Sequence, residues 1–123
     1  MFALWCDGEP PDSVVIYDVT GEDRLDQAEI SAPPLTGDTD RMSLARPPAG
    51  WRVTEGSLDL REGRSYEIRA YRTEPYAYLA GTRFTMAAEI PEDRILIQMA
   101  TQHADVDTFL SPADFRTRAL HYC

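Results

Sequence analysis

The pattern of apolar and polar residues predicts a chain built mainly of β-strands. From Leu58 to Ala88, apolar and polar residues alternate over two runs, which are separated by a tyrosine-rich segment. Alternation with a period of two places every second side chain on one face, as in a half-buried strand, whereas a helix would mix the two sets. We therefore expect two long strands paired antiparallel. Further strands are predicted at residues 2–6 (an edge strand beside the next one), 13–19, 28–31, 42–45, 51–53, 57–60 and 94–99.

The pattern changes at the C-terminus. Ser111 is a good N-cap, Pro112 suits the first helical position, and Asp114 places an acid in the first turn. These signals predict a short helix over residues 112–121, within a terminal segment 111–122. Phe115, Ala119 and Tyr122 would form its packed stripe.

A Leu-x-x-Gly-x-x-Tyr sequence, with Leu60, Gly63 and Tyr66, precedes the first long strand. In Greek-key sandwiches a tyrosine at this place bonds the backbone a few residues upstream, and the glycine provides the turn between sheets. The stretch from Leu58 to Ala88 resembles the end of a fibronectin type III domain, although Glu62 stands where that family usually has proline. The resemblance implies an immunoglobulin-like antiparallel β-sandwich, and recognition more often than catalysis.

Residues 22–50 differ from the rest of the chain. They hold four prolines and little periodicity, and six of their acids precede Arg41. We predict a long irregular loop with one or two short strands, and such loops are often functional. The whole chain of 123 residues is long enough for one domain with its own core. The expected fold is thus an all-β sandwich with a long loop and a C-terminal helix.

Charge points to a class of partner. The formal net charge is −9, and residues 1–50 carry ten acids against three arginines. Such a surface repels nucleic acid and anionic membranes, and it favours encounter with a basic protein. The alternative is that the charge only provides solubility. All twelve basic residues are arginine, which suggests a GC-rich bacterial genome such as that of an actinobacterium.

Two groups of residues are candidates for partner binding. Loop tyrosines at the end of a sandwich offer rigid contact area with a polar tip. The alternative is that the strands continue through residues 73–81, so that the tyrosines share one face and pack on neighbours. The predicted binding residues are Asp23, Asp26, Glu29, Asp38, Asp40, Tyr76, Tyr78 and Leu79.

Cys6 and Cys123 lie near opposite ends of the chain. In an oxidising compartment they could form a disulfide that ties the termini together, whereas in reducing cytoplasm they would be free thiols. No apolar run is long enough for a membrane helix, and the first residues are not a typical export signal. A native Met1 implies a cytoplasmic protein; if the chain is trimmed, an exported or cell-envelope protein is the alternative.

Catalytic patterns are scarce. His103, Asp105 and Asp107 could place an imidazole and two carboxylates on one side of an extended chain, as in a metal-dependent hydrolase. A polar loop gives the same pattern by chance. We expect no cofactor and a non-catalytic module that binds a basic protein, with an immunity protein or inhibitor as one form of this function. A cell-envelope or secreted accessory domain is the second alternative.

Overall fold

The computed structural model describes residues 1–6, 8–44, 46–86, 94–121 and 123. For residues 2–4, 79, 80 and 100 it describes the backbone and not the side chain. Over these residues the fold is all-β, with antiparallel sheets and one short helix, as the sequence predicts.

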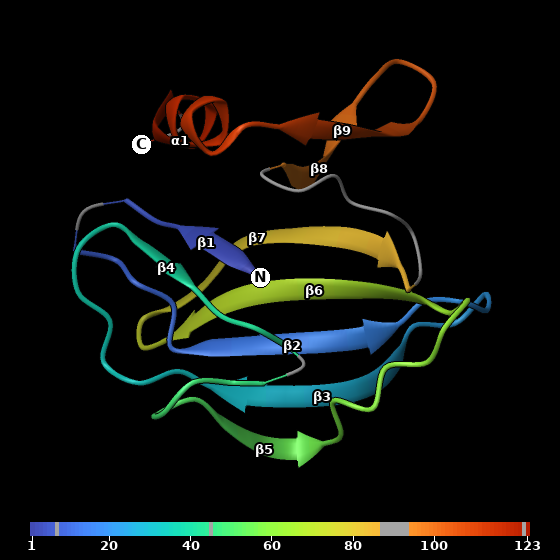
Figure 1. The fold of residues 1–123 in the computed structure, drawn as a ribbon, viewed down its shortest axis with the longest axis horizontal. Coiled ribbons are helices and arrows are strands. Elements are labelled where there is room, and N and C mark those ends of the chain that lie inside the picture. The colour runs from blue at the N-terminus through green and yellow to red at the C-terminus, as the bar shows by residue number, and fades with distance from the viewer. Residues whose placement is uncertain (7, 45, 87–93, 122) are drawn as a thin grey trace.

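The largest element is a five-stranded antiparallel sheet with the order β5-β3-β2-β6-β7 (Figure 1). Its central strand, β2, pairs with β3 on one side and with β6 on the other. The two long strands expected from the alternation are β6 and β7, and they are paired antiparallel. The strand bounds are β2 (Ser13–Asp18), β3 (Leu25–Ser31), β5 (Arg52–Gly56), β6 (Ser65–Thr73) and β7 (Tyr76–Thr85).

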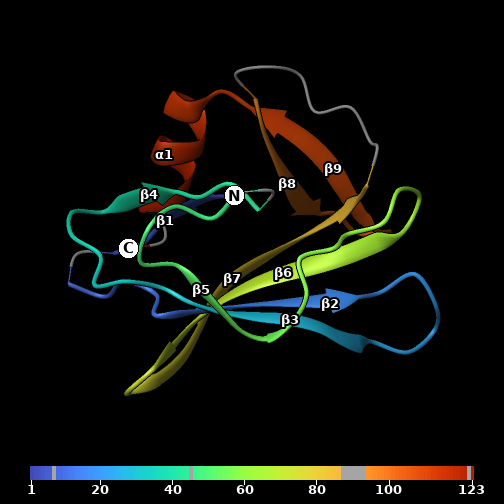
Figure 2. The ribbon, with the colours of Figure 1, turned by 60° about the horizontal axis from the view of Figure 1, so that its bottom comes forward.

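Two ribbons and a helix complete the fold. Strands β1 (Phe2–Leu4) and β4 (Thr39–Arg41) form one ribbon, and β8 (Ile95–Ala100) and β9 (Asp105–Leu110) form the other. Helix α1 (Pro112–His121) follows β9. Figure 2 shows β1, β4 and α1 on the same side of the five-stranded sheet.

The core lies between the five-stranded sheet and the segments around the β1–β4 ribbon. Alternate residues of β2 and β3 supply its centre, because strand geometry sends every second side chain to the same face. Trp5 is also buried, and its indole Nε1 donates a hydrogen bond to the Gly37 carbonyl at 3.0 Å. The buried cluster consists of Val14, Ile16, Ala28, Ile30, Met42, Trp51 and Tyr66.

The tyrosine corner precedes β6. Tyr66 is 1% exposed, and its hydroxyl accepts a hydrogen bond from the Arg61 backbone N–H at 2.9 Å. Gly63 has a φ of 79°, a left-handed conformation that favours glycine. The corner fixes where β6 begins, because it links the Tyr66 ring in the core to the turn before the strand.

Helix α1 has the predicted bounds, so this prediction is confirmed. The Ser111 hydroxyl accepts a hydrogen bond from the Asp114 backbone N–H at 3.1 Å, which is the expected N-cap. Phe115 and Ala119 are half-buried, and Tyr122 lies outside the described residues.

The prediction of a long irregular loop over residues 22–50 is wrong in two places. The strand predicted at residues 28–31 is there, but it is part of the longer strand β3, which occupies seven residues of this segment and pairs with β2 and β5 on its two sides. Strand β4 also lies in this segment. It begins three residues before the strand predicted at 42–45 and ends at Arg41. In β3 only Ala28 and Ile30 are buried, and acidic residues occupy the face away from the core. The alternation of apolar and polar residues that would predict the whole strand is therefore weak.

Three further predictions can be compared with the structure. Strand β1 was expected to lie beside β2, but it pairs with β4. Residues 57–60 form no strand; the chain there leads into the corner, and β5 ends at Gly56. The predicted tyrosine loop is reduced to Glu74 and Pro75, because β6 and β7 continue to Thr73 and from Tyr76. The alternative of continued strands is therefore correct.

Candidate binding surface

The five-stranded sheet has a second face, opposite the core, which we call the open face. Its side chains alternate with those of the core along each strand. In Figure 2 none of the described elements lies over this face. The open face consists of Val15, Tyr17, Asp26, Glu29, Glu55, Glu67, Arg69, Tyr71, Tyr76, Tyr78 and Arg83.

Three tyrosines form a cluster at one end of the open face. The Tyr71 ring lies 5.9 Å from the Tyr76 ring in a stacked arrangement, and 5.5 Å from the Tyr78 ring, measured between centroids. Tyr76 is 74% exposed and Tyr78 is 51% exposed. Closely packed tyrosine rings of this kind offer a rigid contact area at a low cost in side-chain entropy.

Arg69 connects the tyrosine cluster to the middle of the sheet. Its guanidinium carbon lies 5.3 Å from the Tyr78 centroid and 5.6 Å from the Tyr17 centroid, within range of cation–π attraction. Gly81 is the register partner of Arg69. A Cβ at Gly81 would lie 2.9 Å from the Tyr78 hydroxyl and 3.1 Å from Arg69 Cγ, so glycine leaves room for both side chains.

Glu67 is the buried acid of the open face, at 5% exposed. Its carboxylate accepts hydrogen bonds from Arg69 Nε and, at 3.3 Å, from Arg83 Nε. Hydrogen bonds to Tyr71 and Glu67 raise the pKa of Arg69 above its ordinary value. Burial, followed by the interaction with Tyr71, raises the pKa of Tyr17. This half of the open face is therefore internally paired, with charged and aromatic groups held in place.

The other half of the open face carries acids around a groove of about 270 Å³. Val15 and Tyr17 contribute apolar surface, and Asp26, Glu29 and Glu55 contribute carboxylates. Glu29 and Glu55 are direct register partners on β3 and β5. Like charges directly opposite each other destabilise a sheet, so this pair is unfavourable in the isolated protein.

A second groove, of about 370 Å³, lies at the tyrosine-corner end of the sheet. Asp18 lines it and accepts hydrogen bonds from Arg64 Nε at 2.7 Å and from the Thr20 backbone N–H at 2.9 Å. These bonds, with that of Arg64 the largest contribution, lower the pKa of Asp18 from 3.8 to about 2. The carboxylate thus stays ionised and joins the end of β2 to the corner.

The lowered pKa of Asp18 predicts a pH dependence. Below pH 3.8 the unfolded chain binds a proton at Asp18 more readily than the folded protein does, until the folded pKa of about 2 is reached. Stability is therefore fully present above this window and declines as pH falls through it. We expect Asp18→Asn to flatten the slope of the melting temperature between pH 4 and pH 2, measured by circular dichroism. An unchanged slope would contradict this role.

The structure separates the predicted binding residues into two groups. Asp26, Glu29, Tyr76 and Tyr78 share the open face, and Asp23 lies in the turn between β2 and β3. For Leu79 only the backbone, on β7, is described, so the prediction for its side chain lies outside the described residues.

Asp38 and Asp40 belong to the opposite side of the sheet. Asp40 lies on β4, and the Asp38 carboxylate binds both terminal nitrogens of Arg116 on α1. Hydrogen bonds from Arg116 lower the pKa of Asp38. The five predicted acids therefore do not form one loop face, because β3 carries two of them, Asp26 and Glu29, into the sheet, and Asp38 is paired with the helix.

The candidate metal ligands do not form a site. Asp105 and Asp107 lie on β9, where Asp107 accepts a hydrogen bond from Gln98 Nε2 at 3.0 Å. His103 lies in the turn before β9 and is exposed. Within the described part of the chain, no three His, Cys, Asp or Glu residues are grouped so that they could hold a metal ion.

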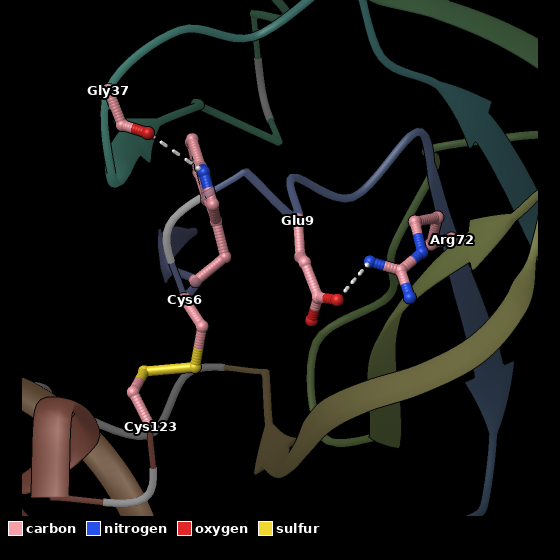
Figure 3. Close-up of a disulfide and its surroundings, with 6 residues drawn as sticks. Cys6, Glu9, Gly37, Arg72 and Cys123 are labelled. Atoms are coloured by element: carbon pink, nitrogen blue, oxygen red, sulfur yellow. Dashed lines mark hydrogen bonds and ion pairs between the residues drawn. A yellow bond between two sulfur atoms is a disulfide. The ribbon is translucent and has the colours of Figure 1, made fainter.

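The two cysteines form a disulfide between the ends of the chain (Figure 3). Cys6 and Cys123 have an S–S distance of 2.09 Å and a Cα–Cα distance of 5.5 Å, across 117 residues of sequence. Near them, Arg72 Nη1 lies 3.4 Å from Glu9 Oε1, which links the segment after Cys6 to β6. The alternative of two free thiols does not hold in this structure.

Most residues of the open face were not predicted from the sequence. Tyr17, Arg69 and Tyr71 are visible only as polar or aromatic residues on the outward side of their strands. Their convergence depends on the order β3-β2-β6-β7 and on the register, in which Tyr17 lies opposite Glu67, and Tyr71 opposite Tyr78. The signal that could have indicated them is the repeated occurrence of aromatic and arginine residues at outward positions of β2 and β6.

Comparison with known proteins gave no match: no family model, curated protein or solved structure is detectably similar to this chain. In the described part of the chain, no helix has the length and apolar character needed to cross a membrane.

Proposed function

We propose that this protein is a non-catalytic recognition module that binds a basic protein partner through the open face. The observation that carries the proposal is the combination on one uncovered sheet face of exposed tyrosines with a groove lined by three carboxylates. Interfaces are enriched in tyrosine at their centres, and complementary charge fixes register and speeds association.

The register pair Glu29 and Glu55 supports a cationic partner. Two carboxylates directly opposite each other cost stability in the free protein. An arginine or lysine side chain of a partner, placed in the groove beside them, would remove this repulsion. The net charge of −9 acts in the same direction at long range. An immunity protein or inhibitor that covers a basic enzyme is the form of this function that the charge favours.

The test compares two variants with the same change of charge. Glu29→Gln with Glu55→Gln removes two negative charges from the open face, and Asp59→Asn with Glu62→Gln removes two from exposed acids near the corner. Tagged wild-type protein is used to capture partners from lysate and envelope fractions of the source organism, with low-salt and high-salt washes. The retained protein is then titrated against both variants.

We expect the open-face variant to bind about tenfold more weakly and the corner variant to change by less than about twofold. The open-face variant should also be more stable than wild type by about 0.2–1 kcal/mol, because the like-charge pair is lost. Weaker binding together with higher stability would indicate that these acids serve partner binding and not the stability of the fold. Equal effects of both variants, or undiminished affinity, would contradict the proposal.

The disulfide supports an oxidising compartment, and we propose that the protein is exported or belongs to the cell envelope. In that setting an accessory domain of a larger envelope assembly would use the same open face. The discriminating measurement is the thiol state of Cys6 and Cys123 in protein trapped by alkylation directly in the source cells.

The assignment of the fold to the immunoglobulin-like class, and to a fibronectin type III-like sandwich, also stays a proposal. The Arg61–Tyr66 hydrogen bond and the following antiparallel pair β6–β7 support it. The layer facing the five-stranded sheet here includes the two-stranded β1–β4 ribbon. An experimental structure would decide between this class and another all-β arrangement.

A further inference from the structure

The last part of the chain is held to the sheet differently from the rest. We call residues 94–123, with β8, β9 and α1, the C-terminal unit. Among the described residues, every member of the buried core cluster and every apolar residue packed on it lies between Met1 and Met86. No described residue of α1 is buried, and Val106, Phe109 and Leu120 are exposed. The C-terminal unit is therefore not part of the main core.

Polar contacts from β8 and from α1 join this unit to the rest of the molecule. The Gln98 side chain bonds the Arg83 backbone, accepting from its N–H at 2.6 Å and donating to its carbonyl at 2.7 Å. On α1, Arg116 pairs with Asp38. These contacts are exposed, and exposed pairs contribute little stability and weaken further with salt.

The covalent contact is the Cys6–Cys123 disulfide. It joins Cys6 to Cys123 at the end of the C-terminal unit. Cys6 directly follows Trp5, whose side chain is buried. A tether of this kind keeps two surfaces at high effective concentration, so contacts that would be weak between separate molecules stay formed. The two sulfur-bearing residues differ in access, because Cys123 is exposed and Cys6 is half-buried.

We propose that this disulfide is a redox-cleavable tether that a protein dithiol opens by attack on Cys123. The thiolate of the dithiol attacks Cys123 Sγ, the bond to Cys6 breaks, and Cys6 leaves as a thiolate and takes up a proton. The second thiol of the dithiol then attacks the mixed disulfide, which releases Cys123 as a thiol. Two electrons pass from the dithiol, which becomes a disulfide, to the two cysteines.

The consequence is a change of conformation limited to one side of the molecule. Without the tether, the C-terminal unit stays attached through the chain but separates from the β1–β4 side and uncovers Asp38. The open-face side chains lie on the other side of the sheet, and the contact of this unit with Arg83 is made to its backbone, so we expect these side chains to stay in place. This inference therefore goes beyond the proposed function and does not depend on it, because the sheet that carries the open face stays folded in both redox states.

Hydrogen exchange of the full protein, with and without dithiothreitol, tests the release. We expect amide exchange in β8, β9 and α1 to become about tenfold faster or more after reduction, while exchange in β2, β3 and β6 changes by less than about twofold. The Cys6→Ser, Cys123→Ser double variant should behave like the reduced protein. Arg116→Ala with an intact disulfide is the control and should change exchange little. Unchanged exchange in the C-terminal unit, or equal acceleration in the sheet, would overturn the proposal.

The site of attack is tested with a dithiol protein whose second cysteine is replaced by serine, so that the mixed disulfide is trapped. We expect peptide mapping to find the trapped protein on Cys123. Linkage to Cys6, or no linkage at all under conditions in which dithiothreitol reduces the bridge, would overturn the proposed route.

Discussion

Ile16→Ala is expected to lower the free energy of unfolding by about 3 kcal/mol. Ile16 is 0% exposed and lies on the central strand β2, between Ala28 of β3 and Ile68 of β6 in the register. Removing its side chain loses buried apolar surface and leaves a cavity that the paired strands on both sides prevent from closing. Urea unfolding, followed by the fluorescence of the two tryptophans, measures the change.

The neighbouring residue provides a matched control. Val15 lies on the same strand, but it is half-buried and points to the open face. We expect Val15→Ala to cost less than about 1 kcal/mol, because the methyl groups removed are partly in contact with water already. If the two variants lost equal stability, the assignment of the core to the Ile16 side would be wrong.

The elements of the fold that depend on short-range signals were predictable. The Ser111 cap and Pro112 mark α1 within a few residues, and the alternation that begins at Tyr66 predicts β6. Only the second part of β3, residues 28–31, was predicted. Its first part was missed, because the register shifts between the pairs Ile16–Ala28 and Tyr17–Asp26 and so interrupts the alternation. Strand β9 was missed because Asp105 and Asp107 make the segment look like a polar loop.

The candidate surface was predictable only in part, since it depends on which strands are neighbours. The sequence indicates that Tyr76 and Tyr78 share a face if the strands continue, and that residues 22–50 are acidic. It does not indicate that Glu29 lies opposite Glu55, or that Tyr71 lies beside both exposed tyrosines. Pairing between strands far apart in the sequence decides these contacts, and one sequence alone does not contain that information.

The second large effect is expected at Glu67. Glu67→Gln should lower the free energy of unfolding by about 2 kcal/mol, because it leaves Arg69 and Arg83 without their shared negative partner. A fully buried pair would cost more, but the Arg69 side chain is 24% exposed and water screens it in part.

Glu55→Gln makes the same chemical change on the same face. Comparing the two variants distinguishes an acid that stabilises the fold from one that destabilises it. Glu67 is enclosed by arginines, so its charge supports the fold, whereas Glu55 lies opposite another acid, so its charge opposes it. We expect Glu67→Gln to destabilise the protein and Glu55→Gln to leave stability unchanged or slightly raised. Raising the salt concentration should reduce both differences, since ions screen attraction and repulsion alike. Equal losses in the two variants would mean that the carboxylates of the open face all serve the fold, and the argument that Glu29 and Glu55 are kept for a cationic partner would fail.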